Sequence, residues 1–224
     1  MNPYEFIKAS KNLNVEFQEW TFTFIKIINK KNKVHLRLIG NYSPFICLEI
    51  IAMKDCDSVE LYNLKFCKDC FDPPYTKEKG GGSILLALAI YVAFDILHAS
   101  AITLFDTSSI KCHGKTISLL KLGLLTMGDS WYARYGFLPE NPNMRDLYLK
   151  HKQILTNSSI LNLSKALQEK IRKYVTTTEN EQVMCIVKRL FTVSCKIYMK
   201  LHEDILLDLN VNIPRNYGQW IKER

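Results

Sequence analysis

A basic run that leads into three glycines is the stretch of this sequence best suited to bind a ligand. Residues 77–83 are Lys-Glu-Lys-Gly-Gly-Gly-Ser, and residues 84–98 follow as an apolar segment of helical character. Glycines let the backbone adopt positive φ and approach a ligand closely, and a helix beginning directly after them leaves its first N–H groups unpaired. Because the positive end of the helix dipole points into this loop, the pattern predicts an anion site, most often for a phosphate. A glycine linker in front of a core helix is the alternative interpretation.

An aromatic segment further along the chain is the second candidate, and its position relative to the glycines is informative. The glycine loop, the apolar helix, a short buried strand over residues 101–106, a second helix over residues 115–125 and a Tyr-x-x-x-Gly-Phe segment occur in this order. Together they resemble the GNAT superfamily of acyl-CoA-dependent N-acetyltransferases. The family's loop pattern matches residues 77–85, and its Tyr-x-x-x-Gly-Phe pattern matches residues 132–137.

The resemblance implies a role for individual residues. In the family, backbone N–H groups of the loop hold the pyrophosphate of the co-substrate acetyl-CoA, and here these would be the amides from about Lys79 to Ser83. The tyrosine of the second pattern commonly protonates the leaving thiolate of CoA, a role that would fall on Tyr132. Packing of Tyr132 between helix and sheet is the alternative interpretation. The cofactor-binding residues implied in this way are Lys77, Lys79, Gly80, Gly81, Gly82 and Ser83.

The family's mechanism also implies a carboxylate that helps to deprotonate the substrate ammonium, often through water. Glu60 lies on the fourth predicted strand and is the candidate, and Glu49 lies on the strand before it. A carboxylate on a half-buried strand is more often solvated or held in a salt bridge, so this alternative stands beside the catalytic one.

Four strands are predicted ahead of the glycines. Residues 20–27 and 34–38 alternate large apolar with smaller or polar side chains, and residues 45–53 and 59–66 follow after short polar links. Such strands predict an antiparallel meander, whereas the strand, loop, helix and strand that come next predict two parallel strands. The predicted fold is α/β, with a mixed, largely antiparallel sheet, a GNAT-like strand-loop-helix-strand core and a helical C-terminal extension. The loop then lies at the carboxyl end of a strand, where ligands usually bind.

The distribution of charge sets the C-terminal part of the chain apart. The chain has 224 residues, of which 47% are hydrophobic, and a formal net charge of +8, so we expect a globular protein. Residues 150–224 hold 13 basic and 7 acidic residues. Contact with nucleic acid or a protein partner is one interpretation, and a solvated lysine-rich surface is the commoner one. We expect a GNAT-like acetyltransferase domain over residues 1–150 and a basic helical extension over residues 151–224, packed on the core or on a partner.

One long helix is predicted within this extension. Residues 178–181, Thr-Glu-Asn-Glu, have the spacing of a capping box, and the apolar stripe that follows continues to Leu201.

The cellular compartment is predicted from the cysteines and from the hydropathy pattern. We see no secretory signal and no apolar run long enough for a membrane span. Seven cysteines with irregular spacing fit a reducing compartment, the cytoplasm or the nucleus, better than a disulfide framework. Cys67 and Cys70 have Cys-x-x-Cys spacing, and Cys112 with His113 could complete a zinc site, but one pair is a weak signal and we predict no metal site.

Taken together, the sequence predicts an N-acetyltransferase that moves an acetyl group from acetyl-CoA to an amine by direct attack in a ternary complex. The alternative is a catalytically silent GNAT-like module that contacts nucleic acid or a protein partner through its basic C-terminal helices. Two departures from the family's pattern favour this alternative. The link over residues 106–131 is longer than usual, and residues 29–32 form a simple turn where the family has a two-helix segment.

Overall fold

The chain forms two compact units in a computed structural model, which describes residues 2–29, 32–41, 44–76, 80–214 and 217–224. The N-terminal unit comprises residues 1–105 and 221–224, and the C-terminal unit comprises residues 106–220. The fold is mixed α/β, with a large, mostly antiparallel sheet and seven α-helices among the described residues. The functional division expected at residue 150 concerns activity and stays a prediction.

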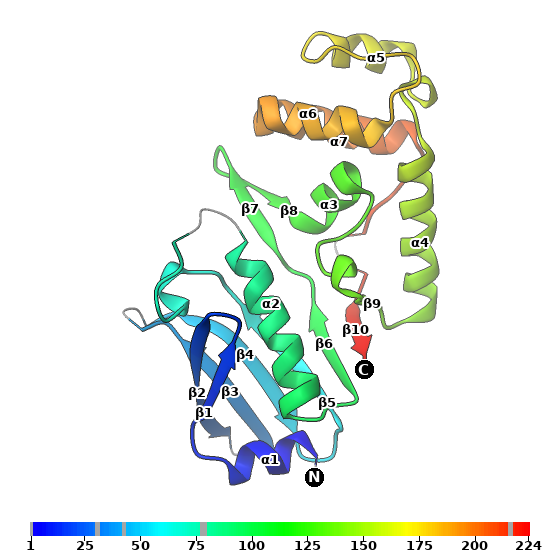
Figure 1. The fold of residues 1–224 in the computed structure, drawn as a ribbon. Helices are drawn as coiled ribbons and strands as arrows, with labels where there is room; N and C mark the ends of the chain where they lie inside the picture. The colour runs from blue at the N-terminus through cyan, green and yellow to red at the C-terminus, as the bar shows by residue number, and fades with distance from the viewer. Residues whose placement is uncertain (1, 30–31, 42–43, 77–79, 215–216) are drawn as a thin grey trace. The chain divides into compact units, whose positions relative to one another are not determined.

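Strands β1 to β6 of the large sheet form the frame of the N-terminal unit (Figure 1). Neighbouring strands pair antiparallel from β1 to β5, and β5 pairs with β6 in parallel. The predicted meander and the predicted parallel pair are therefore confirmed, and β1 is a further strand that the sequence analysis did not predict. The strands are β1 (Leu13–Phe17), β2 (Trp20–Asn29), β3 (Lys33–Ile39), β4 (Ile46–Met53), β5 (Ser58–Leu64) and β6 (Ala101–Phe105).

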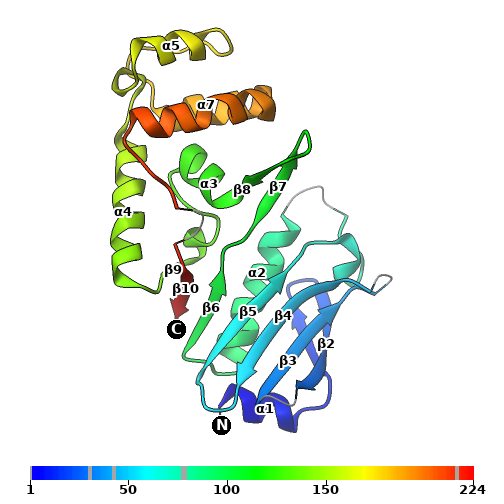
Figure 2. The ribbon, with the colours of Figure 1, turned by 180° about the vertical axis from the view of Figure 1, so that it is seen from behind.

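One helix covers an apolar face of this sheet. Helix α2 (Gly81–Tyr91) continues as a π-helical turn (Val92–Ile96) and packs against β4 and β5, so the predicted buried helix is confirmed. Seen from behind in Figure 2, β3, β4 and β5 lie in front of α2. Period-two burial explains this arrangement, because Val34, Leu36 and Leu38 of β3 are buried while the residues between them are half-buried. Helix α1 (Pro3–Ala9) packs against β2, β3 and β4.

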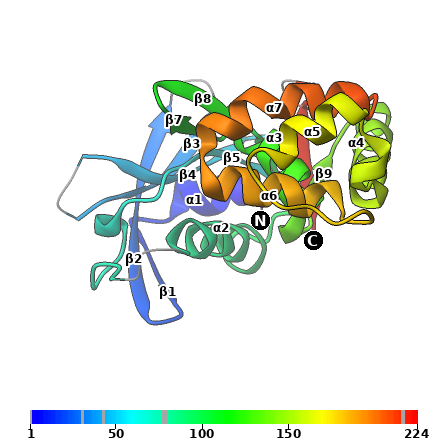
Figure 3. The same ribbon diagram turned by 90° about the horizontal axis from the view of Figure 1, so that it is seen from above.

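The C-terminal unit is mainly helical. A short hairpin opens it, and Figure 3 shows α5 lying across α6 and α7. The Glu140 amide donates to the Gln219 carbonyl, which joins β9 to the start of β10. The elements are β7 (Ser109–Cys112), β8 (Lys115–Ser118), α3 (Leu119–Met127), β9 (Leu138–Pro139), α4 (Pro142–Asn157), α5 (Lys165–Arg172), α6 (Val183–Val193), α7 (Cys195–Asp208) and the start of β10 (Gln219–Glu223), which belongs to the N-terminal unit from residue 221 onward.

Three predicted helix boundaries in this unit are wrong. The helix expected over residues 115–125 begins only at Leu119, because residues 115–118 pair with β7 and Ser118 caps the helix. The expected capping box supplies only a contact from the Thr178 amide to the Glu181 carboxylate, and α6 begins at Val183. The single helix expected to reach Leu201 is two helices, since Ser194 is extended and its hydroxyl accepts a hydrogen bond from the Lys196 amide.

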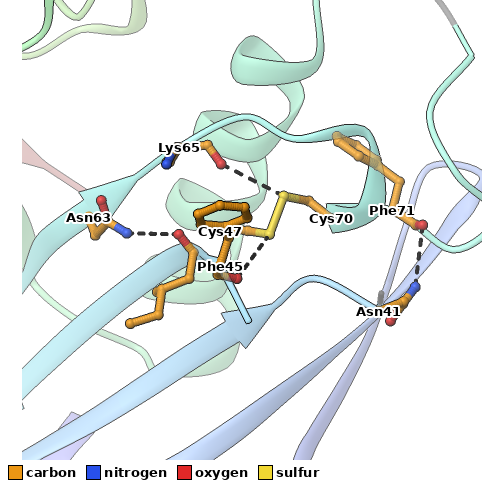
Figure 4. The surroundings of a disulfide bond; sticks show 8 residues. Asn41, Phe45, Cys47, Asn63, Lys65, Cys70 and Phe71 are labelled. Carbon is orange, nitrogen blue, oxygen red and sulfur yellow. Dashed lines mark hydrogen bonds between the residues drawn. A yellow bond between two sulfur atoms is a disulfide. The ribbon is translucent and has the colours of Figure 1, made fainter. Parts of the chain in front are cut away.

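Four of the seven cysteines form two disulfides, contrary to the expectation that disulfides are absent. Cys47 of β4 is bonded to Cys70 in the N-terminal unit (Figure 4), and Cys112 of β7 is bonded to Cys195 in the C-terminal unit. Cys70 and Cys112 are therefore not available as thiolate ligands for zinc. The compartment stays a prediction. No helix in the described ranges has the length and apolar character needed to cross a membrane.

Candidate functional site

The described part of the predicted anion loop lies at the start of α2. Lys77 and Lys79 fall outside the described residues. Gly80 adopts φ +102° and caps the helix without any side-chain hydrogen bond, and the first bond of the helical ladder runs from the Ile84 amide to the Gly80 carbonyl. The amides of the three residues between, Gly81, Gly82 and Ser83, precede this ladder. This end of α2 has the free backbone donors and the positive dipole that an anion requires.

Packing within the protein accounts for two of the glycines. A Cβ on Gly81 would lie 1.9 Å from the Phe66 ring, and a Cβ on Gly80 would lie 3.0 Å from the Tyr75 hydroxyl oxygen. Any larger residue at position 81 would therefore displace an aromatic side chain. These two glycines have a structural reason to be present with or without a bound ligand.

Aromatic side chains gather beside the start of α2, and the sequence analysis did not identify them. The ring centroid of Tyr75 lies 4.9 Å from that of Phe71 and 5.5 Å from that of Phe66, and the Trp20 ring lies 5.1 Å from Phe71. A hollow of about 280 Å³ adjoins this cluster. Its lining residues are Glu19, Trp20, Pro73, Pro74, Tyr75 and Thr76.

The Cys47–Cys70 disulfide anchors the segment that carries this aromatic cluster. Cys70 immediately precedes Phe71, and the Asn41 side-chain amide donates to the Phe71 carbonyl at 3.4 Å (Figure 4). The aromatic cluster is therefore attached to the sheet by a disulfide bond as well as by packing. No sequence motif reveals the cluster, because its members come from three separate segments of the chain.

The two candidate carboxylates lie on the same face of the sheet but in different environments. Glu49 is 3% exposed and accepts hydrogen bonds from the Arg37 side chain at 2.6 Å and the His35 ring at 2.8 Å. Glu60 is half-buried and has no ion pair among the described residues. His35 faces Ile51, which in turn faces Glu60, so the strand register places these side chains on one face. Glu49 is held by structural partners, whereas Glu60 has no ion pair among the described residues.

The sequence analysis did not identify His35, which contacts the candidate carboxylate Glu49. Its Nδ1 contacts Glu49, whereas its Nε2 atom is buried without a hydrogen-bond partner in the described protein. A carboxylate beside one ring nitrogen fixes the orientation of the imidazole. The only signal in the sequence is the alternation of His35 and Arg37 with buried leucines and valine along β3.

Tyr132 lies in the C-terminal unit, inside an aromatic group. Its side chain is 8% exposed, and its ring centroid lies 4.8 Å from that of Trp131 and 6.1 Å from that of Phe137. Burial, and to a lesser extent the negative charge of Asp106, raises the pKa of Tyr132. Burial also raises the pKa of Asp106, whose Oδ2 atom has no partner among the described residues. The Tyr132 phenol is therefore held in its protonated form.

The predicted site residues are divided between the two units. The start of α2, Glu49 and Glu60 belong to the N-terminal unit, and Tyr132 belongs to the C-terminal unit. No protein-family model, curated protein or solved structure matches this chain.

Proposed function

We propose that this protein is a GNAT-like N-acetyltransferase that uses acetyl-CoA as its co-substrate and an amine as the acceptor. The observation that carries the proposal is the connection between β5 and β6. These strands are parallel, and α2 lies between them in the chain. The loop that leads from β5 to α2 ends in the left-handed Gly80, and the first amides of α2 have no acceptor among the described residues. Ligands of α/β sheets commonly bind at the carboxyl end of such a strand, next to the start of a helix.

Each residue has a distinct part in the proposed reaction. The amides of Gly81, Gly82 and Ser83 bind the pyrophosphate of acetyl-CoA, with Gly80 shaping the turn. Glu60, through a water molecule, accepts a proton from the ammonium group of the acceptor. The free amine then attacks the thioester carbonyl carbon, an N–C bond forms and the C–S bond breaks. The leaving CoA thiolate takes a proton from Tyr132, the donor that the resemblance implies, and the acylated nitrogen releases its remaining extra proton, which restores the neutral phenol.

A charge placed at the start of α2 tests the proposal. Ser83 occupies the third position of the helix, and Ser83→Asp and Ser83→Asn differ in charge but little in shape. Acidic residues in a first turn stabilise a helix, so Ser83→Asp should fold at least as well as the parent protein while repelling a diphosphate. Acetyl-CoA at a hundred times its Kd adds about 2.7 kcal/mol to the unfolding free energy. For a chain of this size the melting temperature then rises by roughly 5 to 10 °C.

The expected result is a rise in melting temperature with acetyl-CoA for the parent and for Ser83→Asn, and little or none for Ser83→Asp. Free CoA serves as a second ligand, because it carries the same pyrophosphate without the acetyl group. If millimolar acetyl-CoA leaves the melting temperature of the parent unchanged, the proposal is wrong. If it stabilises all three proteins equally, the ligand binds somewhere other than the start of α2.

A second candidate, a catalytically silent GNAT-like module that binds nucleic acid or a protein, is favoured by the environment of Tyr132. A thiol of ordinary pKa near 8.5 is already a stronger acid than a free phenol near 10. Raising the pKa of Tyr132 further makes proton donation to the thiolate less favourable. The Tyr132→Phe variant distinguishes the candidates. An enzyme should lose turnover while keeping its response to acetyl-CoA, whereas a silent module has no turnover to lose.

A further inference from the structure

Two adjoining hollows lie on the surface of the C-terminal unit, on either side of Tyr174. The first hollow, of about 270 Å³, is lined by residues of α5, of α7 and of the segment after α5. The second, of about 530 Å³, is lined by residues of that same segment and of α6. Tyr174 lines both, and its side chain is 41% exposed. Figure 3 shows how α5 and the segment after it cross α6 and α7. We call the two hollows together the Tyr174 groove.

The Tyr174 groove is lined mainly by positive charge. Its lining residues include five cations, Lys170, Lys173, Lys188, Arg189 and Lys200, and one carboxylate, Asp204. Three exposed lysines line the groove, Lys173, Lys188 and Lys200, and no carboxylate forms an ion pair with them in the ranges that the structure describes. The other cations differ from these three, since Lys170 pairs with Asp204 at 3.4 Å and Arg189 pairs with Glu181. Cations without partners on both sides of an exposed ring form a surface that attracts a polyanion.

The position of the aromatic ring indicates the kind of polyanion. Lysine ammonium groups bind phosphates and carboxylates alike, so charge alone does not separate a nucleic acid from an acidic protein. A tyrosine ring exposed between two groups of lysines adds a surface on which an unpaired base can stack, with the flanking phosphates directed to the lysines on each side. Bases in a duplex are already stacked on one another, so the groove suits a single strand better than a duplex.

We propose that the Tyr174 groove binds single-stranded nucleic acid, with Lys173, Lys188 and Lys200 contacting phosphates and Tyr174 stacking on a base. This activity is independent of acetyl transfer. It uses residues of the C-terminal unit alone, and it stands whether or not acetyl-CoA binds at the start of α2.

Fluorescence anisotropy with a labelled 20-nucleotide oligothymidine, and with oligouridine, tests the proposal on the full chain. We expect binding at 50 mM salt that weakens steeply as salt is raised, because counterions are released when lysines neutralise phosphates. Replacing all three lysines (Lys173→Gln, Lys188→Gln, Lys200→Gln) should weaken binding by about tenfold or more and reduce the slope of log K against log salt by about 2. The Tyr174→Leu variant should weaken binding by about fivefold to a hundredfold while leaving that slope unchanged.

A second set of lysines provides the matched control. Lys11, Lys54 and Lys115 are exposed and lie outside the groove, so their replacement by glutamine removes the same charge. The control triple variant should bind almost as tightly as the parent. If it weakens binding as much as the groove variant does, the effect is one of net charge and the site is wrong. If the oligonucleotides do not bind at 50 mM salt, or if polyglutamate of equal charge competes better than unlabelled oligothymidine, nucleic acid is not the ligand.

Discussion

At the scale of single residues, Glu49 and Glu60 show how a strand register separates a carboxylate with structural partners from one that has no ion pair among the described residues. Both lie in strands and both have the same side chain, but only Glu49 faces Arg37 across the β3–β4 pair. The two hydrogen bonds that it accepts offset the cost of burying its charge. Glu60 faces Thr103 and Ile51, neither of which carries a charge. Because their partners differ, we predict that Glu49 matters for stability and Glu60 for activity.

Replacing each glutamate by glutamine should affect either stability or activity, but not both. Glu49→Gln leaves Arg37 with a weaker partner in a buried setting, so we expect it to lower the unfolding free energy by about 1 to 3 kcal/mol. Glu60→Gln should change it by less than about 0.5 kcal/mol while reducing acetyl transfer. Urea denaturation and an acetyl-transfer assay measure the two effects. Equal losses of stability in both variants would contradict this division of roles.

The sequence made Glu60 a candidate but could not identify the partners of Glu49. The alternation along β3 shows that His35 and Arg37 point away from its buried leucines. It does not show which residues face each other, because register depends on turn geometry and on a shift in the ladder near Leu38. The contact of His35 with Glu49 was therefore identified only from the structure.

At the scale of secondary-structure elements, the start of α2 combines two requirements in one glycine run. Gly80 supplies the left-handed turn, and Gly81 leaves room for the Phe66 ring. A helix without these residues would begin elsewhere or displace the aromatic cluster. The first amides of α2 are thus positioned by packing within the protein itself.

A double-mutant cycle on Gly81 and Phe66 tests this packing. Alanine is favoured over glycine in a helix by up to about 1 kcal/mol, yet Gly81→Ala should destabilise the protein by about 1 to 3 kcal/mol, because its Cβ overlaps the ring. In the background of Phe66→Leu the same change should cost at least about 1 kcal/mol less. Urea denaturation of the parent, both single variants and the double variant provides the four values. Additive effects would mean that the two residues do not compete for the same space.

Elements with a regular apolar pattern were predicted well, and elements defined by a single polar residue were not. Alternation was enough for β2 and β3, the short polar links before them were enough for β4 and β5, and a continuous apolar run was enough for α2. The β7–β8 hairpin was missed because its strands are short and largely exposed, and its turn is His113-Gly114, both with positive φ. The break between α6 and α7 was missed because the apolar stripe continues through it, and only the cap at Ser194 marks the new helix.

At the scale of the whole molecule, the two units differ in how they should respond to pH. Every tyrosine for which the structure indicates a raised pKa lies in the C-terminal unit, namely Tyr132, Tyr148, Tyr198 and Tyr217. Burial is the main cause in each case. The same unit contains His151, whose pKa burial lowers and whose Nδ1 lies 2.7 Å from the Tyr217 hydroxyl. The stability of this unit therefore depends on buried groups that remain uncharged.

The C-terminal unit should lose stability in alkali. Below pH 10 the four phenols are protonated in both the folded and the unfolded chain, so their contribution is fully present. As the pH rises above 10, the unfolded chain releases these protons while the folded unit retains them, and the unfolding free energy falls. Urea denaturation at pH 8 and pH 11 measures the loss, and the absorbance of tyrosinate shows whether the buried phenols ionise only on unfolding.

One variant isolates the contribution of a single phenol. The Tyr198 hydroxyl is buried without a partner among the described residues, so Tyr198→Phe should be neutral or stabilising by about 1 kcal/mol at pH 8, and it should reduce the loss at pH 11. Tyr62→Phe is the control, because Tyr62 is 65% exposed and its ionisation should not depend on folding. If the two variants lose the same stability between pH 8 and pH 11, the alkaline transition does not arise from burial of the Tyr198 phenol. A smaller loss in Tyr198→Phe alone would show that an uncharged tyrosine core holds this unit together.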